Sequence, residues 1–309
     1  MLSSNTNKLT WVGIAVGVIA ALGITSMVFF PNVLSSAETT IKNTMSGFTN
    51  PTKDAESYTD LQFTYDESSK TASVNAVKST TSPNTDLSGD DITIPEKVKH
   101  DGNTYTITSI AYAGFHGVSA KSITLPRTLT TISGNAFSSS NILSGTLSIP
   151  SNVKSIGDSA FTFMTNVKSI NIPDATTSIG TNLISSSSIQ NLSIGNGVTA
   201  IPDNAFANAT NLQSVTISDS VKSIGNFAFS GDTTLSDVTM GQNVTTIGAF
   251  AFSSTNLTKI SLPMTVTSTT PISFSNKDSS VGITISVDKS FDSSSNNQIV
   301  PPNIEVVRQ

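Results

Sequence analysis

Apolar residues recur through most of the chain at a spacing far longer than the period of a helix or a strand. Between residues 198 and 262 the order Val-x-x-Ile-x-x-x-Ala-Phe is followed by Leu-x-x-Val-x-Ile or a close variant, and the unit occurs three times, beginning at Val198, Val221 and Val244. Successive copies therefore begin 23 residues apart. A fixed period of this size predicts a solenoid, because one copy cannot bury its apolar residues alone and neighbouring copies must stack to form a continuous core.

The same unit extends over residues 92–287. Its phenylalanine slot is occupied by Ile184 in one unit and by phenylalanine in the others, which are Phe115, Phe137, Phe161, Phe206, Phe229, Phe252 and Phe274. Each of these eight slots is followed by an alternating pair of apolar residues, and a further pair, Ile92 and Ile94, precedes the first slot. The pattern therefore predicts nine short strands.

The alternation predicts which side chains face the core. In Leu-x-x-Val-x-Ile the last two apolar side chains point inward and the residue between them points outward. Several of the pairs are followed directly by proline, which ends a strand because it has no N–H for the ladder. Val-x-x-Ile-Gly predicts a second short extended segment, and Ala-Phe places a ring in the interior. Stacking at about 4.8 Å per coil gives one parallel sheet of nine strands, roughly 38 Å long.

The N-terminal region differs from the repeats in hydropathy and in period. Residues 1–8 are polar with one cation, Lys8, and the next 22 residues, Leu9 to Phe30, carry no charge. As a helix this segment is roughly 33 Å long, which is enough to cross a hydrocarbon core of about 30 Å. With Lys8 on one side and Glu38 on the other, the positive-inside rule predicts a cytoplasmic N-terminus and extracellular repeats.

Two interpretations of residues 9–30 stay open, a single-pass transmembrane helix and a cleaved signal peptide. The length of the apolar run favours the uncleaved anchor, whereas Ser35-Ser36-Ala37 fits a small-residue cleavage site and predicts secretion after cleavage following Ala37. Both interpretations place the repeats outside the cytoplasm. The predicted localisation is therefore the cell membrane, or the medium if cleavage occurs.

The remaining segments are assigned by composition and alternation. Residues 31–57 are polar and are predicted to form a stalk. Residues 58–91 contain two alternating runs that predict a hairpin capping the first edge of the solenoid, followed by a Ser/Thr/Asp loop. Residues 288–309 are predicted to form a C-terminal cap, with a final strand from Ile304 to Val307 that covers the open edge.

Composition excludes several classes of function. Charged residues make up 12% of the chain and the formal net charge is -5, so the chain lacks the basic surface that binding to DNA or RNA requires. Cysteine is absent, which excludes disulfides, thiolate metal sites and a cysteine nucleophile.

Candidate catalytic and metal-binding residues are sparse. Nothing in the sequence places the two histidines, His100 and His116, beside residues that complete a triad or a metal site. Three aspartates offer oxygen ligands to Ca²⁺, but their spacing fits no defined loop; they are Asp86, Asp90 and Asp91. Aspartates in the variable turns are predicted to form those turns, and they are Asp158, Asp203 and Asp232. We therefore predict no enzymatic activity, no cofactor and no metal.

The outward strand positions form the predicted binding surface. The candidate partner-binding residues are Lys168, Gln190, Asn191, Gln213, Ser214, Asp237 and Lys259. Alternation places the residues from Gln190 onward on one face, at one lateral position of neighbouring strands, as a contiguous strip. The outward positions include no aromatic residue and few charges. A protein-recognition face, a solvated face without a ligand and a glycan-binding face are all compatible with this pattern.

The most regular units read Ile-x-Ile-Pro at residues 170–173 and Val-x-x-Ile-Gly at residues 153–157, with Ala-Phe at 160–161. This pattern, over about residues 61–287, resembles the repeat of the BspA-like leucine-rich-repeat surface proteins. The resemblance implies a leucine-rich-repeat solenoid, a right-handed superhelix that is mostly β with a parallel sheet, displayed on a cell surface to bind proteins or other cells. The chain departs from the family pattern in lacking its usual cysteine and a C-terminal wall-sorting motif, which leaves the N-terminal segment as the attachment.

These features predict a membrane-anchored extracellular leucine-rich-repeat protein that mediates protein–protein interaction or cell adhesion without catalysis. The alternative is a structural or assembly component of the cell envelope in which the repeats act as a spacer. The predicted partners are the membrane, through the N-terminal helix, and a protein or glycan ligand.

Overall fold

The computed structural model describes residues 53–55, 58, 60–76, 86–266, 268–269, 273–278, 280–287 and 304–308. The chain divides into two compact units, Met1–Pro51 and Thr52–Gln309, and all described residues belong to the second. The membrane-spanning segment predicted at residues 9–30 lies outside the described residues. Within the part of the chain that the structure describes, no helix has both the length and the hydropathy needed to cross a bilayer.

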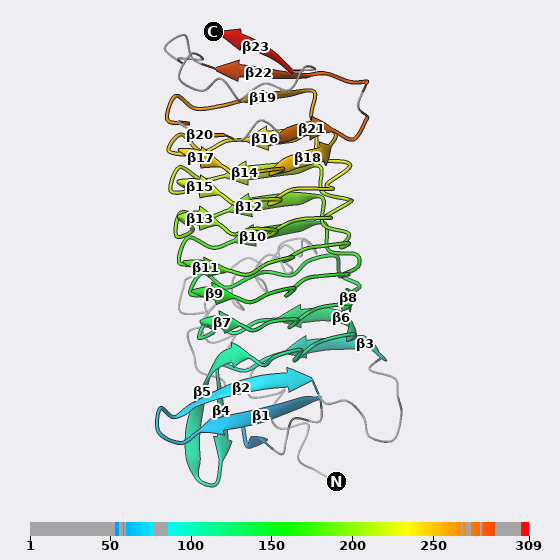
Figure 1. The fold of residues 1–309 in the computed structure, drawn as a ribbon. Coiled ribbons are helices and arrows are strands. Elements are labelled where there is room, and N and C mark those ends of the chain that lie inside the picture. Colours follow the sequence, from blue (N-terminus) through cyan, green and yellow to red (C-terminus); the bar gives the residue numbers. More distant parts are fainter. Residues whose placement is uncertain are drawn as a thin grey trace, which may run out of the picture. The chain divides into compact units, whose positions relative to one another are not determined.

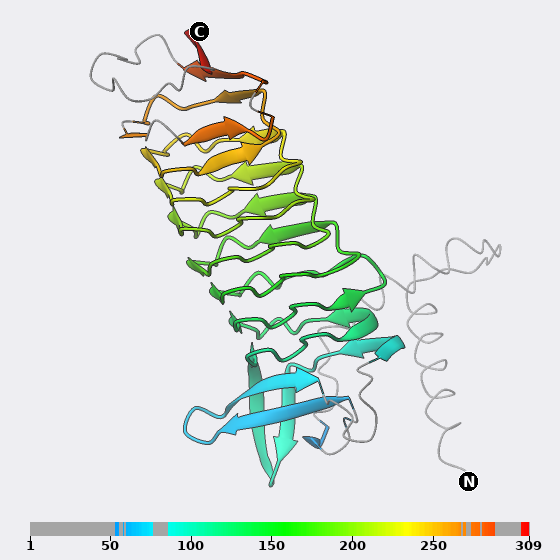
Figure 2. The same ribbon diagram turned by 45° about the vertical axis from the view of Figure 1, so that its right-hand side comes forward.

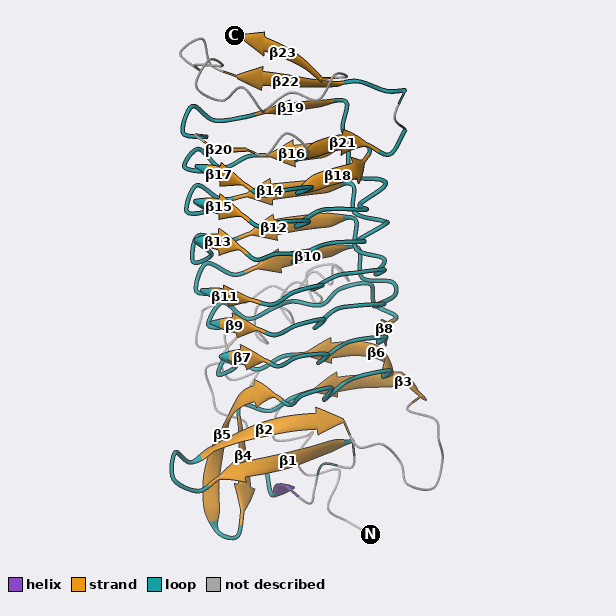
Figure 3. Cartoon of the chain, viewed as in Figure 1, coloured by secondary structure: helices purple, strands orange, loops and turns teal. Residues whose placement is uncertain are grey.

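The repeats form a parallel β-solenoid, as the period predicts (Figure 1). Most coils contribute one longer strand and one short strand on different sides of the stack (Figure 3). The longer strands are β3 (Asp86–Thr93), β6 (Ser119–Thr124), β10 (Ser169–Ile172), β12 (Asn191–Ile194), β14 (Ser214–Ile217), β16 (Asp237–Thr239), β19 (Lys259–Ser261) and β22 (Ile283–Val287). The short strands are β7 (Thr131–Ile132), β9 (Ser155–Ile156), β11 (Ser178–Ile179), β13 (Ala200–Ile201), β15 (Ser223–Ile224), β17 (Thr246–Ile247) and β20 (Ser268–Thr269).

The longer strands do not form the single nine-stranded sheet that alternation predicts. The pair Leu147 and Ile149 forms no strand. The coil from Phe137 to Phe161 spans 24 residues, and it contains a turn at Gly145, whose N–H donates to the Ile142 carbonyl. β8 (Asn141–Ile142) pairs with β6 instead. The chain thus makes its backbone bonds to the preceding coil before it reaches Leu147, and the prediction of a strand there is wrong.

The result is three shorter sheets on this side, ordered β3-β6-β8, β10-β12-β14-β16 and β19-β22-β23. The second interruption follows a shorter coil: Phe252 and Leu257 are 5 residues apart, whereas Phe229 and Leu235 are 6 apart. A change of one residue alters the strand register. In this coil the residues after the alanine form β18 (Phe252–Thr255), which pairs with β21 (Phe274–Asn276).

The short strands confirm the second extended segment, but they form two ladders that separate at Pro202. In four coils a glycine follows the isoleucine and donates its N–H to the preceding coil, as Gly180 does to Ile156 and Gly225 to Ile201, each at 2.9 Å. Pro202 occupies this position after β13. Because proline has no N–H, the bond to the preceding coil is lost there.

The third side of each coil, which we call the Ala-Phe corner, is the turn of five residues around the Ala-Phe pair. Its backbone bonds run between coils: the Phe206 N–H donates to the Ala228 carbonyl at 2.8 Å, and the Phe229 N–H donates to the Ala251 carbonyl at 2.7 Å. The corner therefore satisfies its backbone groups by pairing with the next coil, as the strands do.

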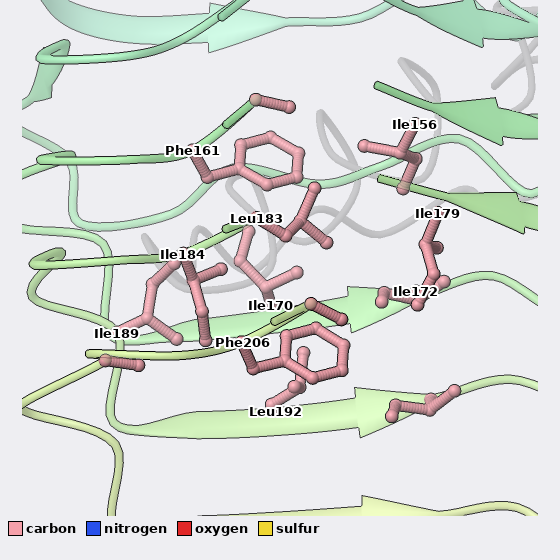
Figure 4. Close-up of a cluster of buried hydrophobic side chains, with 14 of the residues drawn as sticks. Ile156, Phe161, Ile170, Ile172, Ile179, Leu183, Ile184, Ile189, Leu192 and Phe206 are labelled. Carbon is pink, nitrogen blue, oxygen red and sulfur yellow. The ribbon is translucent and has the colours of Figure 1, made fainter. Parts of the chain in front are cut away.

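The predicted ladder of buried rings is confirmed. Phe229 lies between Phe206 and Phe252, with ring centroids 5.2 Å and 5.0 Å away, and all three rings are buried. Figure 4 shows where the ladder is interrupted, with the aliphatic Ile184 between the coils of Phe161 and Phe206. Apolar side chains therefore pack against one another throughout the interior, although the stack of aromatic rings is interrupted in the coil of Ile184.

Hairpins occupy the N-terminal end of the solenoid (Figure 2). The predicted hairpin is confirmed as β1 (Leu61–Asp66) paired antiparallel with β2 (Thr71–Ala76). β2 continues in parallel to β5 (Asn103–Ile110), which also forms a hairpin with β4 (Lys97–His100). Residues 53–55, the end of the predicted stalk, pair with β4 through the Lys99 N–H and the Lys53 carbonyl, 3.0 Å apart.

Two further assignments concern the ends of the repeat array. Residues 86–91, predicted to belong to a loop, instead begin β3, which pairs in parallel with β6. This part of the loop prediction is wrong, because pairing with the next coil outweighs the turn-like composition. The predicted final strand is confirmed as β23 (Ile304–Arg308), which pairs in parallel with β22.

Candidate functional site on the strand face

The strand face is the outer side of the sheet β10-β12-β14-β16, and it carries most of the predicted binding residues (Figure 1). Parallel register places Asn191 beside Ser214 and Ser214 beside Asp237. Lys168, Gln190 and Gln213 form a neighbouring column, in which the Gln190 N–H donates to the Lys168 carbonyl at 2.8 Å and the Gln213 N–H to the Gln190 carbonyl at 2.7 Å. The predicted strip therefore exists, but as two adjacent columns rather than at one lateral position.

Lys259 is the one predicted residue that lies outside this sheet. It is in β19, whose register partner is β22, where Lys259 lies beside Thr284. No hydrogen-bonded pairing joins β16 to β19, so the sheet that carries Asp237 ends before Lys259. Both side chains are exposed, and in the described part of the chain they form no ion pair with each other.

Side chains on the strand face partly satisfy one another. The Ser214 hydroxyl donates to Asn191 Oδ1 at 2.7 Å, and Asn191 Nδ2 donates to Ser169 Oγ at 3.4 Å. These bonds hold short side chains in place across three strands, while Lys168, Gln213 and Asp237 stay exposed. The face is thus a regular, ordered polar surface that can exchange hydrogen bonds with a partner.

Asp158 and Asp203 lie in turns, as predicted, and their side chains also join neighbouring coils. Asp158 Oδ1 accepts from the Thr181 N–H at 2.7 Å, and Asp203 Oδ1 accepts from the Asn226 N–H at 2.6 Å. Each carboxylate therefore caps a backbone donor one coil further on, because a coil period of about 23 residues brings a turn beside its successor.

Asp232 is a buried carboxyl in the apolar stack. Its Oδ1 accepts from the Ala209 N–H at 2.8 Å, and its Oδ2 has no hydrogen-bond partner among the described residues. Burial raises the pKa of Asp232 well above its ordinary value, and the bond from Ala209 opposes the rise only in part. Asp232, which was predicted to form a turn, therefore destabilises the core when its carboxyl is ionised.

Replacing Asp232 with asparagine is expected to stabilise the protein at neutral pH and to flatten its pH dependence. Because the pKa is raised in the folded state, the folded chain holds this proton more tightly, and stability falls as pH rises from about 4 toward the raised value. Asparagine keeps the acceptor for Ala209 and removes the charge, so we expect a gain of at least about 1 kcal/mol at pH 7. Denaturant midpoints at pH 4 and pH 7.5 measure it. Exposed Asp237→Asn is the control, and parallel pH profiles for Asp232→Asn and the unmodified chain would contradict the assignment.

A cluster of ionisable and aromatic residues lies where the first hairpin meets β5. The Tyr105 hydroxyl donates to Glu67, and Lys70 Nζ lies 2.8 Å from the other Glu67 oxygen. Hydrogen bonds from Lys70 and then Tyr105 lower the pKa of Glu67, and the bond to Glu67 raises the pKa of Tyr105. Both shifts move away from neutrality, so neither group is suited to proton transfer near pH 7. The cluster is a clasp between two hairpins.

His100 and Asp91, two of the residues considered as candidates for catalysis or metal binding, contact neighbouring side chains. His100 stacks on Tyr65 with ring centroids 4.2 Å apart. Asp91 binds Lys121 Nζ at 2.7 Å and Ser122 Oγ at 2.6 Å. Over the described residues, no three histidine, aspartate or glutamate side chains converge in a way that could hold a metal ion.

The Ala-Phe corner carries a feature that the sequence reasoning missed. Phe227 and Phe250 stack with ring centroids 5.0 Å apart on the outside of the solenoid, and Phe227 is 40% exposed. The signal in the sequence is Phe-Ala-Phe at 227–229 and 250–252, where most units have a small or polar residue before the alanine. The predicted binding surface consisted of outward strand positions, which include no aromatic residue, so the prediction did not include Phe227 and Phe250.

The geometry defines a class of protein, a leucine-rich-repeat solenoid with a polar parallel sheet. The model of the family described as BspA type Leucine rich repeat region matches six copies, over residues 91–213 and 199–300. The chain therefore belongs to the BspA-type leucine-rich-repeat family. The comparison with curated proteins returned no match.

Comparison with solved structures finds similar leucine-rich repeat proteins. A leucine-rich repeat protein from Bacteroides ovatus is 20% identical with a TM-score of 0.50, over 81% of this chain and 66% of that one. A leucine-rich repeat protein from Eubacterium ventriosum is 27% identical with a TM-score of 0.48, over 56% of this chain and 48% of that one. The chain thus spans 66% and 48% of the lengths of these two proteins.

Proposed function

We propose that this chain is a non-catalytic, membrane-anchored extracellular protein that binds a protein partner along the strand face and so mediates adhesion. The observation that carries the proposal is the pair of in-register polar columns on β10, β12, β14 and β16. A partner that docks along them must desolvate several side chains at once, and their positions are already held by the backbone ladder. Such preorganisation reduces the entropy lost on binding.

The charges on the strand face favour recognition by hydrogen bonding over long-range attraction. Lys168 is a cation and Asp237 is an anion, and Lys259 lies on the next sheet, so the strand face has little net field. Exposed charges of mixed sign are screened at physiological ionic strength and contribute little to attraction at a distance. We therefore expect binding to depend only weakly on salt.

We expect the combined change Gln213→Ala, Asp237→Ala and Lys259→Ala to weaken adhesion by about tenfold or more without lowering thermal stability, because all three side chains are exposed, Gln213 and Asp237 on the strand face and Lys259 on β19 of the next sheet. Cells that display the full chain, allowed to settle on neighbouring or host cells in buffers of increasing salt, provide the measurement.

The matched control changes the same number of exposed residues beside the short-strand ladders, and consists of Thr177→Ala, Thr199→Ala and Lys222→Ala. Asp203 and Asp232 are unsuitable as controls because each bonds a backbone N–H of a neighbouring coil. If the control set abolishes adhesion and the strand-face set leaves it intact, the binding surface lies elsewhere on the solenoid.

The anchor at residues 9–30 is part of the same proposal, supported by its 22-residue uncharged length and by Lys8 before it. Protease added to intact cells is expected to remove the repeats while a short N-terminal tag survives inside. Recovery of a mature chain that begins at Glu38 in the medium would show cleavage instead, and the protein would then be secreted.

A further inference from the structure

The outer positions of the Ala-Phe corner have an unusual backbone conformation. The residue two positions before the phenylalanine slot has a positive φ in every coil from the first to the one at Phe250, and these residues are Ala113, Asn135, Ser159, Asn182, Asn204, Phe227 and Phe250. Asparagine is favoured among side chains in the left-handed region, and bulky aromatic side chains are disfavoured. Phe227 and Phe250 both have φ of 56°, so the fold holds two large rings where smaller residues fit better. Bulky residues retained in such a conformation point to a function.

The two rings form a ledge rather than a continuous apolar surface. Their centroids are 5.0 Å apart and their planes differ by 13°, which matches the spacing of neighbouring coils, so one ring lies above the other along the solenoid. The preceding coil has the shorter Asn204 at this position. Among the described residues, the face of Phe227 that is turned away from Phe250 therefore has no aromatic neighbour, in agreement with the 40% exposure of Phe227.

Free amides lie on the coil beneath the ledge. The carboxamides of Asn204 and Asn208 are exposed and make no hydrogen bond with any described residue. Asn208 Oδ1 lies 2.6 Å from the position that a Cβ on Gly231 would take, so this amide reaches across to the coil of Phe227. Each carboxamide offers both donors and an acceptor.

The carboxylate beside the ledge is already engaged in local hydrogen bonds. Asp203, the charged residue next to Asn204 in the sequence, accepts from the Asn226 N–H at 2.6 Å and from Asn226 Nδ2 at 3.2 Å. An open ring face beside uncharged donors and acceptors suits a ligand that has an apolar C–H face and hydroxyl groups around its rim. A phosphate or carboxylate ligand would need a cation, which the ledge residues do not supply.

We propose that the Ala-Phe corner carries a binding site for a neutral glycan, in which a pyranose ring packs on Phe227, supported by Phe250, and its hydroxyls bond to Asn204 and Asn208. This site lies on a different side of the coil from the strand face. It is therefore independent of the proposed protein-binding surface.

The test is affinity electrophoresis of the full chain through gels that contain soluble xylan, glucomannan or mixed-linkage β-glucan. The unmodified chain is expected to be retarded by at least one of them. The double variant Phe227→Asn/Phe250→Asn is expected to lose at least about tenfold in affinity with an unchanged or higher thermal midpoint, because asparagine occupies the same backbone position in neighbouring coils. Asn208→Ser, a residue found at the equivalent positive-φ positions 139, 186 and 254, is expected to lose a few-fold.

The matched control is Phe163→Asn, which also removes an exposed phenylalanine with φ of 56°. Among the described residues Phe163 stacks on no other ring, so this variant is expected to bind the polysaccharides normally. Absence of retardation by all three polysaccharides, or full binding by the double variant, would overturn the proposal. So would sedimentation showing that the unmodified chain dimerises through this ledge and the double variant does not, since a second copy would then be the occupant. The strand-face variant is expected to keep its polysaccharide affinity, which separates this site from the proposed adhesion surface.

Discussion

Replacing Phe229 with alanine is expected to lower the free energy of unfolding by about 3 to 5 kcal/mol. The ring is fully buried and stacks on Phe206 at 5.2 Å and on Phe252 at 5.0 Å. Its removal leaves a cavity between two coils, and the coils cannot collapse onto it because their spacing is set by the backbone bonds of the strand ladders. In a solenoid the loss falls on the interface between neighbours, so the unfolding transition is also expected to broaden.

Denaturant unfolding of the full chain measures the effect of Phe229→Ala. The control is Lys222→Ala, an exposed residue near the same coil, which is expected to change stability by no more than about 0.5 kcal/mol. Equal and small shifts of the two midpoints would show that the interior is not held together by the stacked rings.

Replacing Gly225 with alanine is expected to cost about 3 kcal/mol or more, at the upper end of the range for overpacking. A Cβ on Gly225 would lie 2.5 Å from the Asp203 backbone nitrogen and 2.6 Å from the Pro202 carbonyl carbon. These are backbone atoms of the preceding coil, so relief requires the coils to separate. The glycine is needed here for close approach rather than for backbone freedom.

Ser133 provides the matched control, because it follows Ile132 in the second coil as Gly225 follows Ile224 in a later one. Its N–H makes the same bond to the preceding coil, to the Ile110 carbonyl at 3.2 Å, and its side chain is accommodated. Ser133→Ala is therefore expected to be nearly neutral, within about 0.5 kcal/mol. If thermal unfolding gives the same midpoint for Gly225→Ala as for Ser133→Ala, the coils are not packed backbone to backbone at this turn.

The clasp and the turn aspartates show that several charged groups in this protein serve local structure. Glu67, Lys70 and Tyr105 join two hairpins at the N-terminal end, and Asp158 and Asp203 each cap a donor in the following coil. The surfaces that we propose for recognition are the columns of the strand face, which are mainly hydroxyl and amide groups with Lys168 and Asp237, and the ledge at the Ala-Phe corner.

The sequence by itself determined the coil and its interior. The spacing of phenylalanine slots and apolar pairs predicted the stack of Phe206, Phe229 and Phe252. Apolar residues that recur at a fixed period can be recognised as buried without knowing which backbone groups bond to which. The hairpin at 61–76 and the last strand at 304–308 were predicted on the same basis.

Tertiary structure alone decided which coil bonds to which, and where the ladders break. Leu147 has the right neighbours for a strand and forms none, because earlier residues of its coil have already bonded to β6. The break at Pro202 and the burial of Asp232 depend likewise on what lies about 23 residues away along the chain. The period gives the number of residues between equivalent positions in neighbouring coils. The hydrogen-bond partners of the backbone depend in addition on the length of each turn within a coil. The ledge of Phe227 and Phe250 became visible only when stacking brought two such turns side by side.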